Sequence, residues 1–368
     1  MNRCRYSFRF LKWHLAHTIP MTMRHTSTYP ELPRKSALHR FLDNLYIYFR
    51  DGAPCAAYDG LGLDVKGRRL DDFVSNHDWL KVLYLRLSSA GLGAATPMEK
   101  LIFDGASQCY LLSDKFCFWS FLDRHAIPVV PVLAHMVKGK LFDFTPEGRP
   151  MTSMSRIFVK PAAGLCGNSA CLLAVRDGKF YQGDKQVELS DFSAPDQDWI
   201  FQPVIENHAD LKALNPGTLN TMRIVTCRTK SGAIEPWDPG MVRIGRSNAV
   251  VDNFAKGGIG VGIGEDGKLE RYGYSHDKEL NYTKMEQHPD SHIVFAGRPI
   301  PFYNEAVALV KKAHGLFPSL QTIGWDVAIT SDGPILLEGN QSWDIEMLQV
   351  VHHKGSAARF REIYGGKR

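Results

Sequence analysis

The stretch that most constrains the fold of this chain runs from Ile323 to Asn340, IGWDVAITSDGPILLEGN. Two apolar runs that contain β-branched residues, Trp325 to Thr330 and Ile335 to Leu337, flank the turn-forming residues Ser331 to Pro334. Residues of these types favour extended strands joined by a tight reversal. The sequence therefore predicts an antiparallel β-hairpin at this point of the chain.

Three polar side chains of the hairpin are candidates for a cation site. Side chains two residues apart on a strand share a face, so Glu338 and Asn340 point the same way. If the loop has an odd number of residues, Asp326 lies directly across from Glu338. Two carboxylates and an amide oxygen then converge, and this set repels itself unless a cation such as Mg²⁺ binds to its hard oxygens. A solvated polar face on an edge hairpin is the alternative interpretation.

The composition bounds the class of protein. A chain of 368 residues with 44% hydrophobic and 23% charged residues is typical of a soluble globular protein with two or three structural units. The net charge of +5, with no basic cluster beyond the N-terminus, argues against nucleic-acid binding. The seven cysteines form no Cys-x-x-Cys pair, so we expect neither a zinc site nor a disulfide framework. Free cysteines fit a reducing compartment, so we expect a cytoplasmic protein. The sequence contains no run of about 18 apolar residues, so we expect no transmembrane segment.

The first 95 residues divide into a basic arm and a helical part. Up to Pro33 the chain is rich in arginine and has no acidic residue before Glu31. Three hypotheses fit this arm: an amphipathic segment in peripheral contact with an anionic membrane, a transit peptide, or a partly ordered basic arm. From Ser36 to about Ala95, apolar residues recur at spacings of three and four, which predicts a helical cap that shapes the substrate site.

Another helix is predicted to begin at Lys115. Ser113 or Asp114 can cap it, and its apolar pattern ends near Pro128. A lysine in the first turn opposes the helix macrodipole, which hints at a function for Lys115. The apolar residues from Ile127 to Leu133 predict a buried strand, placed at an edge or a strand end by its two prolines.

A loop of small residues follows Lys160. The lysine ends an apolar strand that begins at Ser155, and residues Pro161 to Ala170 precede the next strand, Cys171 to Val175. Such a loop lets backbone N–H groups approach a polyanion, as a flap over phosphates would. It is not a Walker A loop, because no Gly-Lys-Ser/Thr follows and a strand comes next. A plain β-hairpin is the alternative.

Three later segments carry further candidates. Trp199 to Ile205 is an apolar strand in which Pro203 breaks the ladder, and the freed backbone groups suit an adenine edge. Arg223 and Arg243 lie on two apolar strands, and their planar guanidinium groups suit phosphates or carboxylates, with structural ion pairs as the alternative. Phe302 to Leu316 is predicted to be an amphipathic helix that leads into the hairpin.

The order of these features resembles the ATP-grasp superfamily of carboxylate–amine ligases, and most closely its sugar-transfer-associated group. The resemblance covers roughly residues 104–350 and is carried by the runs NTMRIVT (220–226), DNF with Gly-Gly (252–258), IGWD (323–326) and GPILLEGN (333–340). It implies an α+β ATP-grasp fold, in which two α+β lobes grip ATP behind an N-terminal, mainly helical cap. The implied units are the basic arm and cap (1–95), the N-terminal lobe with the phosphate flap (96–202) and the C-terminal lobe with the Mg²⁺ site (203–368).

The resemblance also implies roles for individual residues. It assigns the phosphates of ATP to Lys115, Lys160, Gly164, Gly167, Asn168 and Ser169. It assigns the adenine and ribose to Gln202, Pro203, Val204, Ile205, His208 and Asp210. It assigns Mg²⁺ to Asp326, Glu338 and Asn340. It implies that the side of the site where an acyl phosphate forms is lined by Arg223, Arg243 and Asn253.

Two departures from the family pattern matter. Gln202 stands where many members have Glu, which keeps an adenine contact but weakens that assignment. Gln341 to Asp344 replaces the commoner small-Pro-Gly ending, which predicts an unusual acceptor pocket.

The implied function is an ATP-dependent carboxylate–amine, or carboxylate–thiol, ligase that works through an acyl phosphate in saccharide-linked or secondary-metabolite biosynthesis. The implied partners are small-molecule carboxylate and amine substrates, with sugar-linked ones among the candidates. The resemblance leaves open whether the protein forms a homodimer. The absence of a Gly-x-Ser-x-Gly elbow agrees, because no protein nucleophile is needed. One alternative is an ATP-dependent phosphotransferase on the same fold. The other is a non-catalytic nucleotide-binding protein, against which the full set of lysines and carboxylates argues.

Overall fold

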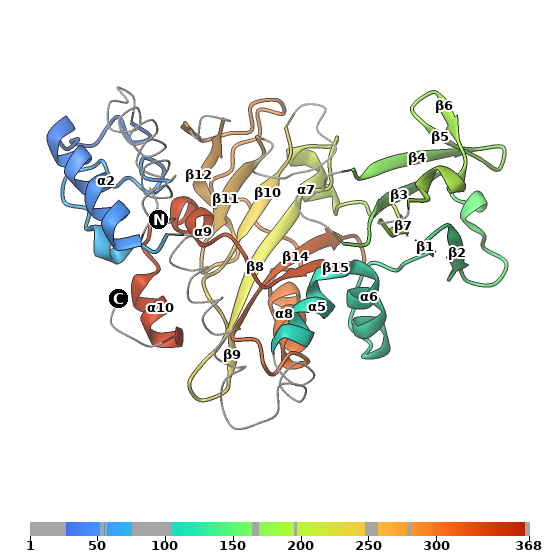
Figure 1. The fold of residues 1–368 in the computed structure, drawn as a ribbon. Helices are drawn as coiled ribbons and strands as arrows, with labels where there is room; N and C mark the ends of the chain where they lie inside the picture. Colours follow the sequence, from blue (N-terminus) through green and yellow to red (C-terminus); the bar gives the residue numbers. More distant parts are fainter. Residues whose placement is uncertain are drawn as a thin grey trace, which may run out of the picture.

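The computed structural model describes residues 27–51, 55, 57–75, 105–163, 169–194, 197–246, 257–277 and 281–364. These residues form two antiparallel sheets with helices packed around the second one (Figure 1). The expected α+β fold is confirmed, and helices are few in the described part of the chain. The seven-stranded sheet lies to the right in Figure 1, and helices α2 (Ala37–Asp51) and α10 (Ala357–Tyr364) lie on the opposite side of the eight-stranded sheet.

The seven-stranded sheet has the order β2-β1-β7-β3-β4-β5-β6. Its strands are β1 (Ala134–Val137), β2 (Lys140–Asp143), β3 (Arg156–Pro161), β4 (Cys171–Arg176), β5 (Lys179–Gln182), β6 (Lys185–Val187) and β7 (Trp199–Pro203). The eight-stranded sheet has the order β13-β12-β11-β10-β8-β14-β15, and β9 pairs with β8. Its strands are β8 (Thr221–Arg228), β9 (Ile234–Pro236), β10 (Met241–Ile244), β11 (Ile259–Ile263), β12 (Leu269–His276), β13 (Tyr282–Met285), β14 (Thr322–Thr330) and β15 (Gly333–Asn340).

The α-helices in the described part of the chain are α2 (Ala37–Asp51), α5 (Gly105–Ser113), α6 (Lys115–Arg124), α7 (Ala209–Leu214), α8 (Tyr303–Gly315), α9 (Ile345–Val351) and α10 (Ala357–Tyr364). Short 3-10 helices occupy Leu70–Asp72, Met151–Ser153 and Leu189–Phe192. Among the described residues, no helix is long and apolar enough to cross a membrane.

Strand β14, which lies between β8 and the edge strand β15, is buried on both faces from Thr322 to Ile329. On one face, Trp325 and Val327 pack into a large apolar cluster with side chains of α5, α6 and α8. On the other face, a second cluster joins the sheet to α9, α10 and the N-terminal segment. Because burial of apolar area is the main favourable contribution to folding, these two clusters stabilise the sheet that carries β14, and the first cluster packs directly against that strand.

The predicted hairpin is confirmed, but its loop is shorter than expected. Thr330 pairs with Gly333, so only two residues form the loop, and Gly333 adopts the left-handed φ of 118°. A register shift follows between Asp326 and Val327, because Leu337 is an extra residue in β15. This bulge, rather than an odd loop, places Asp326 directly across from Glu338.

Proline decides two other differences. The strand predicted from Ile127 to Leu133 is wrong: these residues are irregular, and β1 begins only at Ala134. They are still anchored, because Val130 N–H donates to the Leu336 carbonyl at 3.0 Å and Leu336 N–H donates to the Pro128 carbonyl at 3.0 Å. A proline has no N–H for a ladder. For the same reason β7 stops at Pro203 instead of continuing to Ile205.

The helix predictions agree closely with the structure. Helix α6 begins at Lys115, and the Asp114 carboxylate caps it by accepting a hydrogen bond from Cys117 N–H at 2.8 Å. Helix α8 lies within the predicted range, with Phe302 as its N-cap. In the N-terminal part, α2 confirms the first helix of the range predicted to be helical, Ser36 to about Ala95, whereas residues 76–95 of that range lie outside the described residues.

Candidate active site

Two lysines converge on one carboxylate where the two sheets meet. Lys160 lies on β3 of the seven-stranded sheet, and its Nζ lies 3.2 Å from Glu338 Oε1 on β15 of the eight-stranded sheet. Lys115, from the first turn of α6, places its Nζ 3.9 Å from the same oxygen. We call Glu338, Lys115 and Lys160 the Glu338 cluster. The lysines that the sequence predicted as phosphate ligands are therefore brought together.

The backbone around Lys115 explains how it reaches this position. The Asp114 cap fixes the start of α6, and Lys115 N–H donates to the Ala162 carbonyl at 2.8 Å. That bond ties the helix to the residue that follows β3. Burial lowers the pKa of the Lys115 ammonium; Glu338 opposes this shift and Lys160 adds to it. Two close ammonium groups with one carboxylate favour the binding of a further anion.

Asp326 lies in a second cluster, built across three neighbouring strands. Arg223 Nε on β8 lies 2.6 Å from Asp326 Oδ1, and Arg243 Nη2 on β10 lies 3.1 Å from Asp326 Oδ2. The Thr221 hydroxyl accepts hydrogen bonds from Arg243 Nε at 3.0 Å and Nη2 at 2.8 Å. We call Asp326, Arg223, Arg243 and Thr221 the Asp326 cluster.

The register of the strands causes these contacts. Asp326 is paired with Arg223 between β14 and β8, and Arg243 is paired with Thr221 between β10 and β8. Thr221 and Arg223 are two residues apart, so they share a face. Burial tends to raise the pKa of Asp326, but Arg223 and Arg243 together outweigh it and hold that pKa below its ordinary value.

These pairings change the argument for a cation made from the sequence. We expected Asp326 and Glu338 to repel each other unless a metal ion neutralised them. In the structure each carboxylate is neutralised by two protein cations, so electrostatic repulsion alone does not require a metal. Within the described part of the chain, no group of three or more His, Cys, Asp or Glu side chains forms a metal site.

The donor set still fits a hard cation at Glu338 and Asn340. Asn340 pairs with Gly324 at the end of β15, and its amide oxygen is the atom that could bind a metal. Its buried Nδ2, which has no hydrogen-bond partner among the described residues, is an N–H group and is not a metal ligand. The Glu338 side chain is 32% exposed, and both lysines approach the same oxygen, Oε1. Oxygen donors of this kind suit Mg²⁺. Asp326 already binds one arginine at each oxygen, so any metal there must share those oxygens with them.

The segment predicted to hold adenine lies at the end of β7. Gln202 is buried, and its Nε2 donates to the Val130 carbonyl at 3.2 Å. Val204 and Ile205 line a cavity of about 150 Å³. Ligand pockets commonly measure about 300 to 1,000 Å³, so a nucleotide would extend well beyond this cavity.

The two residues predicted near the ribose lie where α7 begins. His208 is the N-cap of α7, and its Nδ1 accepts a hydrogen bond from Asp210 N–H at 3.3 Å. The His208 N–H donates to the Ile329 carbonyl at 2.7 Å, which ties this segment to β14. Their local contacts are thus those of a helix start packed on β14.

Several predicted residues lie outside the described part of the chain: Gly164, Gly167, Asn168 and Asn253. The strands that border the predicted flap are present. Strands β3 and β4 pair antiparallel, with Arg156 opposite Ala174 and Val159 opposite Cys171. Ser169 is described and adopts a left-handed φ of 66°.

Sequence reasoning missed Thr221 and misjudged Trp343. Thr221 lies two residues before Arg223, and only the pairing of β10 with β8 brings it to Arg243. The segment Gln341 to Asp344 was expected to shape an acceptor pocket. Instead, Trp343 is buried and its Nε1 donates to Thr322 Oγ1 at 3.0 Å, while Asp344 caps α9. Gly324 makes room for it, because a Cβ there would lie 2.5 Å from Trp343 Cβ.

Comparison with known proteins adds a family and several solved structures of low similarity. The family model described as sugar-transfer associated ATP-grasp matches residues 100–364. The sequence matches no curated protein. N5-carboxyaminoimidazole synthetase from Staphylococcus aureus, complexed with ADP, is 10% identical with a TM-score of 0.39, over 70% of this chain and 52% of that one.

Two further solved structures are similar at the same level. The biotin carboxylase–β-γ-ATP complex from Campylobacter jejuni is 10% identical, with a TM-score of 0.40, over 70% of this chain and 47% of that one. D-alanine–D-alanine ligase from Bacillus anthracis is 10% identical, with a TM-score of 0.34, over 68% and 69%. The chain thus spans about half the length of the first two structures named. The family assignment rests on the family model.

Proposed function

The chain belongs to the sugar-transfer-associated ATP-grasp family, and on this premise we propose that it is an ATP-dependent ligase that joins a carboxylate to an amine. The observation that carries the proposal is the Glu338 cluster. Two lysines from different elements meet one carboxylate at the junction of two sheets. Phosphoryl transfer needs mainly positioned positive charge, and this junction supplies it.

We assign the residues as follows. Lys115 and Lys160 bind phosphate oxygens of ATP, and the flap implied by the family resemblance, Ala162 to Ser169, would cover them. The segment Gln202 to Ile205 contacts the adenine, with His208 and Asp210 near the ribose. Arg223, Arg243 and Asn253 line the side where the carboxylate substrate binds.

Magnesium would be held by Glu338, Asn340 and Asp326. Bound there, Mg²⁺ would neutralise charge on the phosphates during transfer. Glu338 would offer a carboxylate oxygen and Asn340 its amide oxygen, and both lysines approach only Oε1 of Glu338. The two arginines keep Asp326 ionised, because their charges hold its pKa below the ordinary value.

The reaction proceeds in two displacements. A carboxylate oxygen of the first substrate attacks the γ-phosphorus of ATP, the bond from that phosphorus to the β–γ bridging oxygen breaks, and ADP leaves. The amine then attacks the carbonyl carbon of the acyl phosphate, phosphate leaves with the C–O electron pair, and the nitrogen loses a proton. Arginine forks bind carboxylates and phosphates alike, so Arg223 and Arg243 are suited to hold the acid through the first step.

Hydroxylamine tests this proposal against phosphoryl transfer to an alcohol. It attacks an acyl phosphate without a specific acceptor pocket, so a screen of amino acids, uronic acids and lactyl acids with ATP and Mg²⁺ should yield a hydroxamate for the correct acid. ADP and phosphate should form together in that reaction. The Lys160→Ala variant serves as the catalytic control and should give no hydroxamate above background.

Two outcomes contradict the ligase. A stable phosphorylated product that resists hydroxylamine would indicate a kinase on the same scaffold. If millimolar ATP causes no thermal shift of the protein, with Mg²⁺ or without it, the protein does not bind ATP and the proposal of an ATP-dependent enzyme is wrong.

A further inference from the structure

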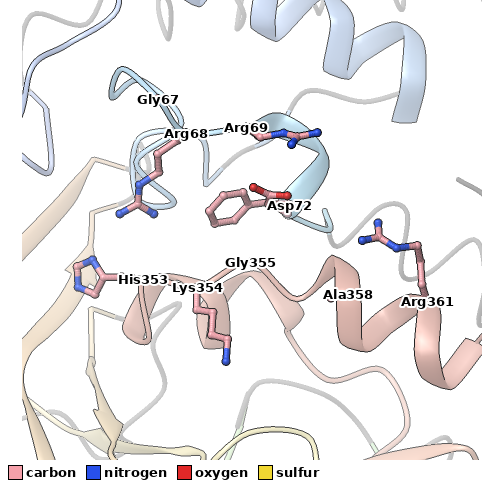
Figure 2. Close-up of a pocket in the computed structure, with 10 residues that line it drawn as sticks. Gly67, Arg68, Arg69, Asp72, His353, Lys354, Gly355, Ala358 and Arg361 are labelled. Atoms are coloured by element: carbon pink, nitrogen blue, oxygen red, sulfur yellow. The ribbon is translucent and has the colours of Figure 1, made fainter.

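We propose that a pocket far from the Glu338 cluster binds the phosphoryl group of a small phosphorylated molecule. The pocket lies between residues 67–73 and the segment that joins α9 to α10 (Figure 2). It measures about 420 Å³, within the range of about 300 to 1,000 Å³ that is usual for small-molecule sites. Figure 1 shows α10 on the opposite side of the eight-stranded sheet from the seven-stranded sheet that carries Lys160.

Arginines dominate the charge of this pocket. Arg68, Arg69 and Arg361 line it against a single carboxylate, Asp72. Among the described residues, neither Arg69 nor Arg361 forms an ion pair. Figure 2 shows the Arg361 guanidinium directed from α10 toward the segment that carries Arg69 and Asp72. The side chains that line the pocket therefore carry an excess of positive charge, which no ion pair of Arg69 or Arg361 compensates within the described part of the chain.

Lys354 and His353 complete the basic rim in different ways. Lys354 lines the pocket, but its ammonium is directed away from residues 67–73 in Figure 2. Burial lowers the pKa of His353 to about 4, and Arg68 and Lys284 act in the same direction. The His353 ring is thus neutral at pH 7, so the arginines provide the charge that faces a ligand.

One side of the pocket is rigidly built. The Arg68 guanidinium is held by the Leu61 carbonyl, which accepts from Nη1 at 3.0 Å, and by the rings of Tyr29 and Phe73 at 5.4 and 5.9 Å. Gly355 permits close contact of the two walls, because a Cβ there would lie 1.9 Å from the Asp72 carbonyl oxygen. A preorganised arginine loses little entropy when it binds an anion.

The charge and shape together favour a phosphoryl group. A guanidinium fork matches two oxygens of a phosphate, and a dianion balances an excess of two positive charges better than a monocarboxylate does. The three arginines gather at one local, open pocket, whereas a nucleic acid would need basic residues along an extended track. A small phosphorylated molecule is thus the ligand class that the pocket fits.

Pyrophosphate is a suitable probe for this site. Because it can also bind Lys115 and Lys160, the measurement uses the full chain with Lys160→Ala, and calorimetry is carried out at low ionic strength. We expect saturable binding, and Arg361→Gln or Arg69→Gln should weaken it at least about tenfold, the effect of losing a charge-assisted contact. Lys66→Gln, an exposed charge on the same loop that does not line the pocket, should leave affinity unchanged.

The outcomes separate this site from the proposed ligase site. All variants are first compared by thermal unfolding, and each arginine variant should melt within a few degrees of its parent. Absence of pyrophosphate binding overturns the proposal, as does equal weakening by Lys66→Gln. Sedimentation with phosphatidic acid vesicles without binding of soluble pyrophosphate would also overturn it, because the source would then be a lipid headgroup. Failure of the ligase assay leaves these measurements intact, since they contain no ATP.

Discussion

The Asp326 cluster and the Glu338 cluster each pair one carboxylate of the same hairpin with two cationic side chains, yet the two clusters are built differently. The Asp326 cluster lies within a single sheet, and its carboxylate side chain is 8% exposed. The Glu338 cluster joins two sheets, and its carboxylate side chain is 32% exposed. A buried charge needs its partners for stability, whereas a partly solvated one can exchange them. The comparison teaches that the Asp326 cluster contributes more to the stability of the sheet, besides the binding roles proposed for its members, whereas the Glu338 cluster can exchange its partners for a ligand at little cost in stability.

The largest effect should come from breaking the Asp326 cluster. Asp326→Asn keeps the side-chain shape but leaves Arg223 and Arg243 uncompensated in a poorly solvated site. We expect a loss of about 3 kcal/mol in the free energy of unfolding, as for other buried pairs that lose one partner. Urea denaturation of the variant and the parent measures it.

Asp332→Asn is the matched control, because Asp332 is exposed at the loop of the same hairpin. It should change stability by less than about 0.5 kcal/mol. If Asp326→Asn is as stable as this control, the Asp326 cluster does not support the scaffold. Should Asp326→Asn fail to fold, Thr221→Val gives a milder test, since it removes only the hydroxyl that holds Arg243.

The Glu338 cluster should respond in the opposite way. Lys160→Ala should lower ATP-dependent turnover by roughly 10² to 10³-fold, because positive charge on the phosphates matters most in the transition state. Its free energy of unfolding should change by no more than about 1 kcal/mol, as for partly exposed ion pairs. Steady-state kinetics and urea denaturation together measure the two effects.

Lys179→Ala is the control for charge alone, since Lys179 is exposed on β5 of the same sheet. It should keep the parent activity. A Lys160→Ala protein that unfolds readily but retains its specific activity would show that the ion pair with Glu338 is structural.

The smallest effect should be the change in the stability contribution of Asp326 as the pH is lowered. The folded-state pKa of Asp326 is held low by its arginines, against the effect of burial. Its contribution to stability is therefore complete above the unfolded-state pKa of about 3.9 and is lost as the pH falls through the lower folded-state value. The stability difference between the parent and Asp326→Asn should be constant from pH 7 to 5 and should shrink below pH 4. Urea denaturation at pH 7, 5 and 3 measures it, and a difference that grows in acid would contradict this assignment.

Local features of the chain were predictable because neighbouring residues decide them. The Asp114 cap, the start of α6 and the two strands of the hairpin all depend on residue types within a few positions. The family resemblance was likewise carried by short runs in a fixed order, and the family match confirms it. The errors arose where prolines interrupt apolar runs, as between Ile127 and Leu133, because apolar character alone does not show which N–H groups a ladder needs.

By itself, the sequence determined which charged residues the chain has and which local elements carry them. Only the tertiary structure decided their partners, because Arg223 is 103 positions from Asp326 and Lys160 is 178 positions from Glu338. The strand order β10-β8-β14 delivers two arginines to one carboxylate, and the bulge at Leu337 sets Asp326 across from Glu338. Strand pairing and register result from burial of whole faces of the sheet, and no short stretch of sequence contains that information.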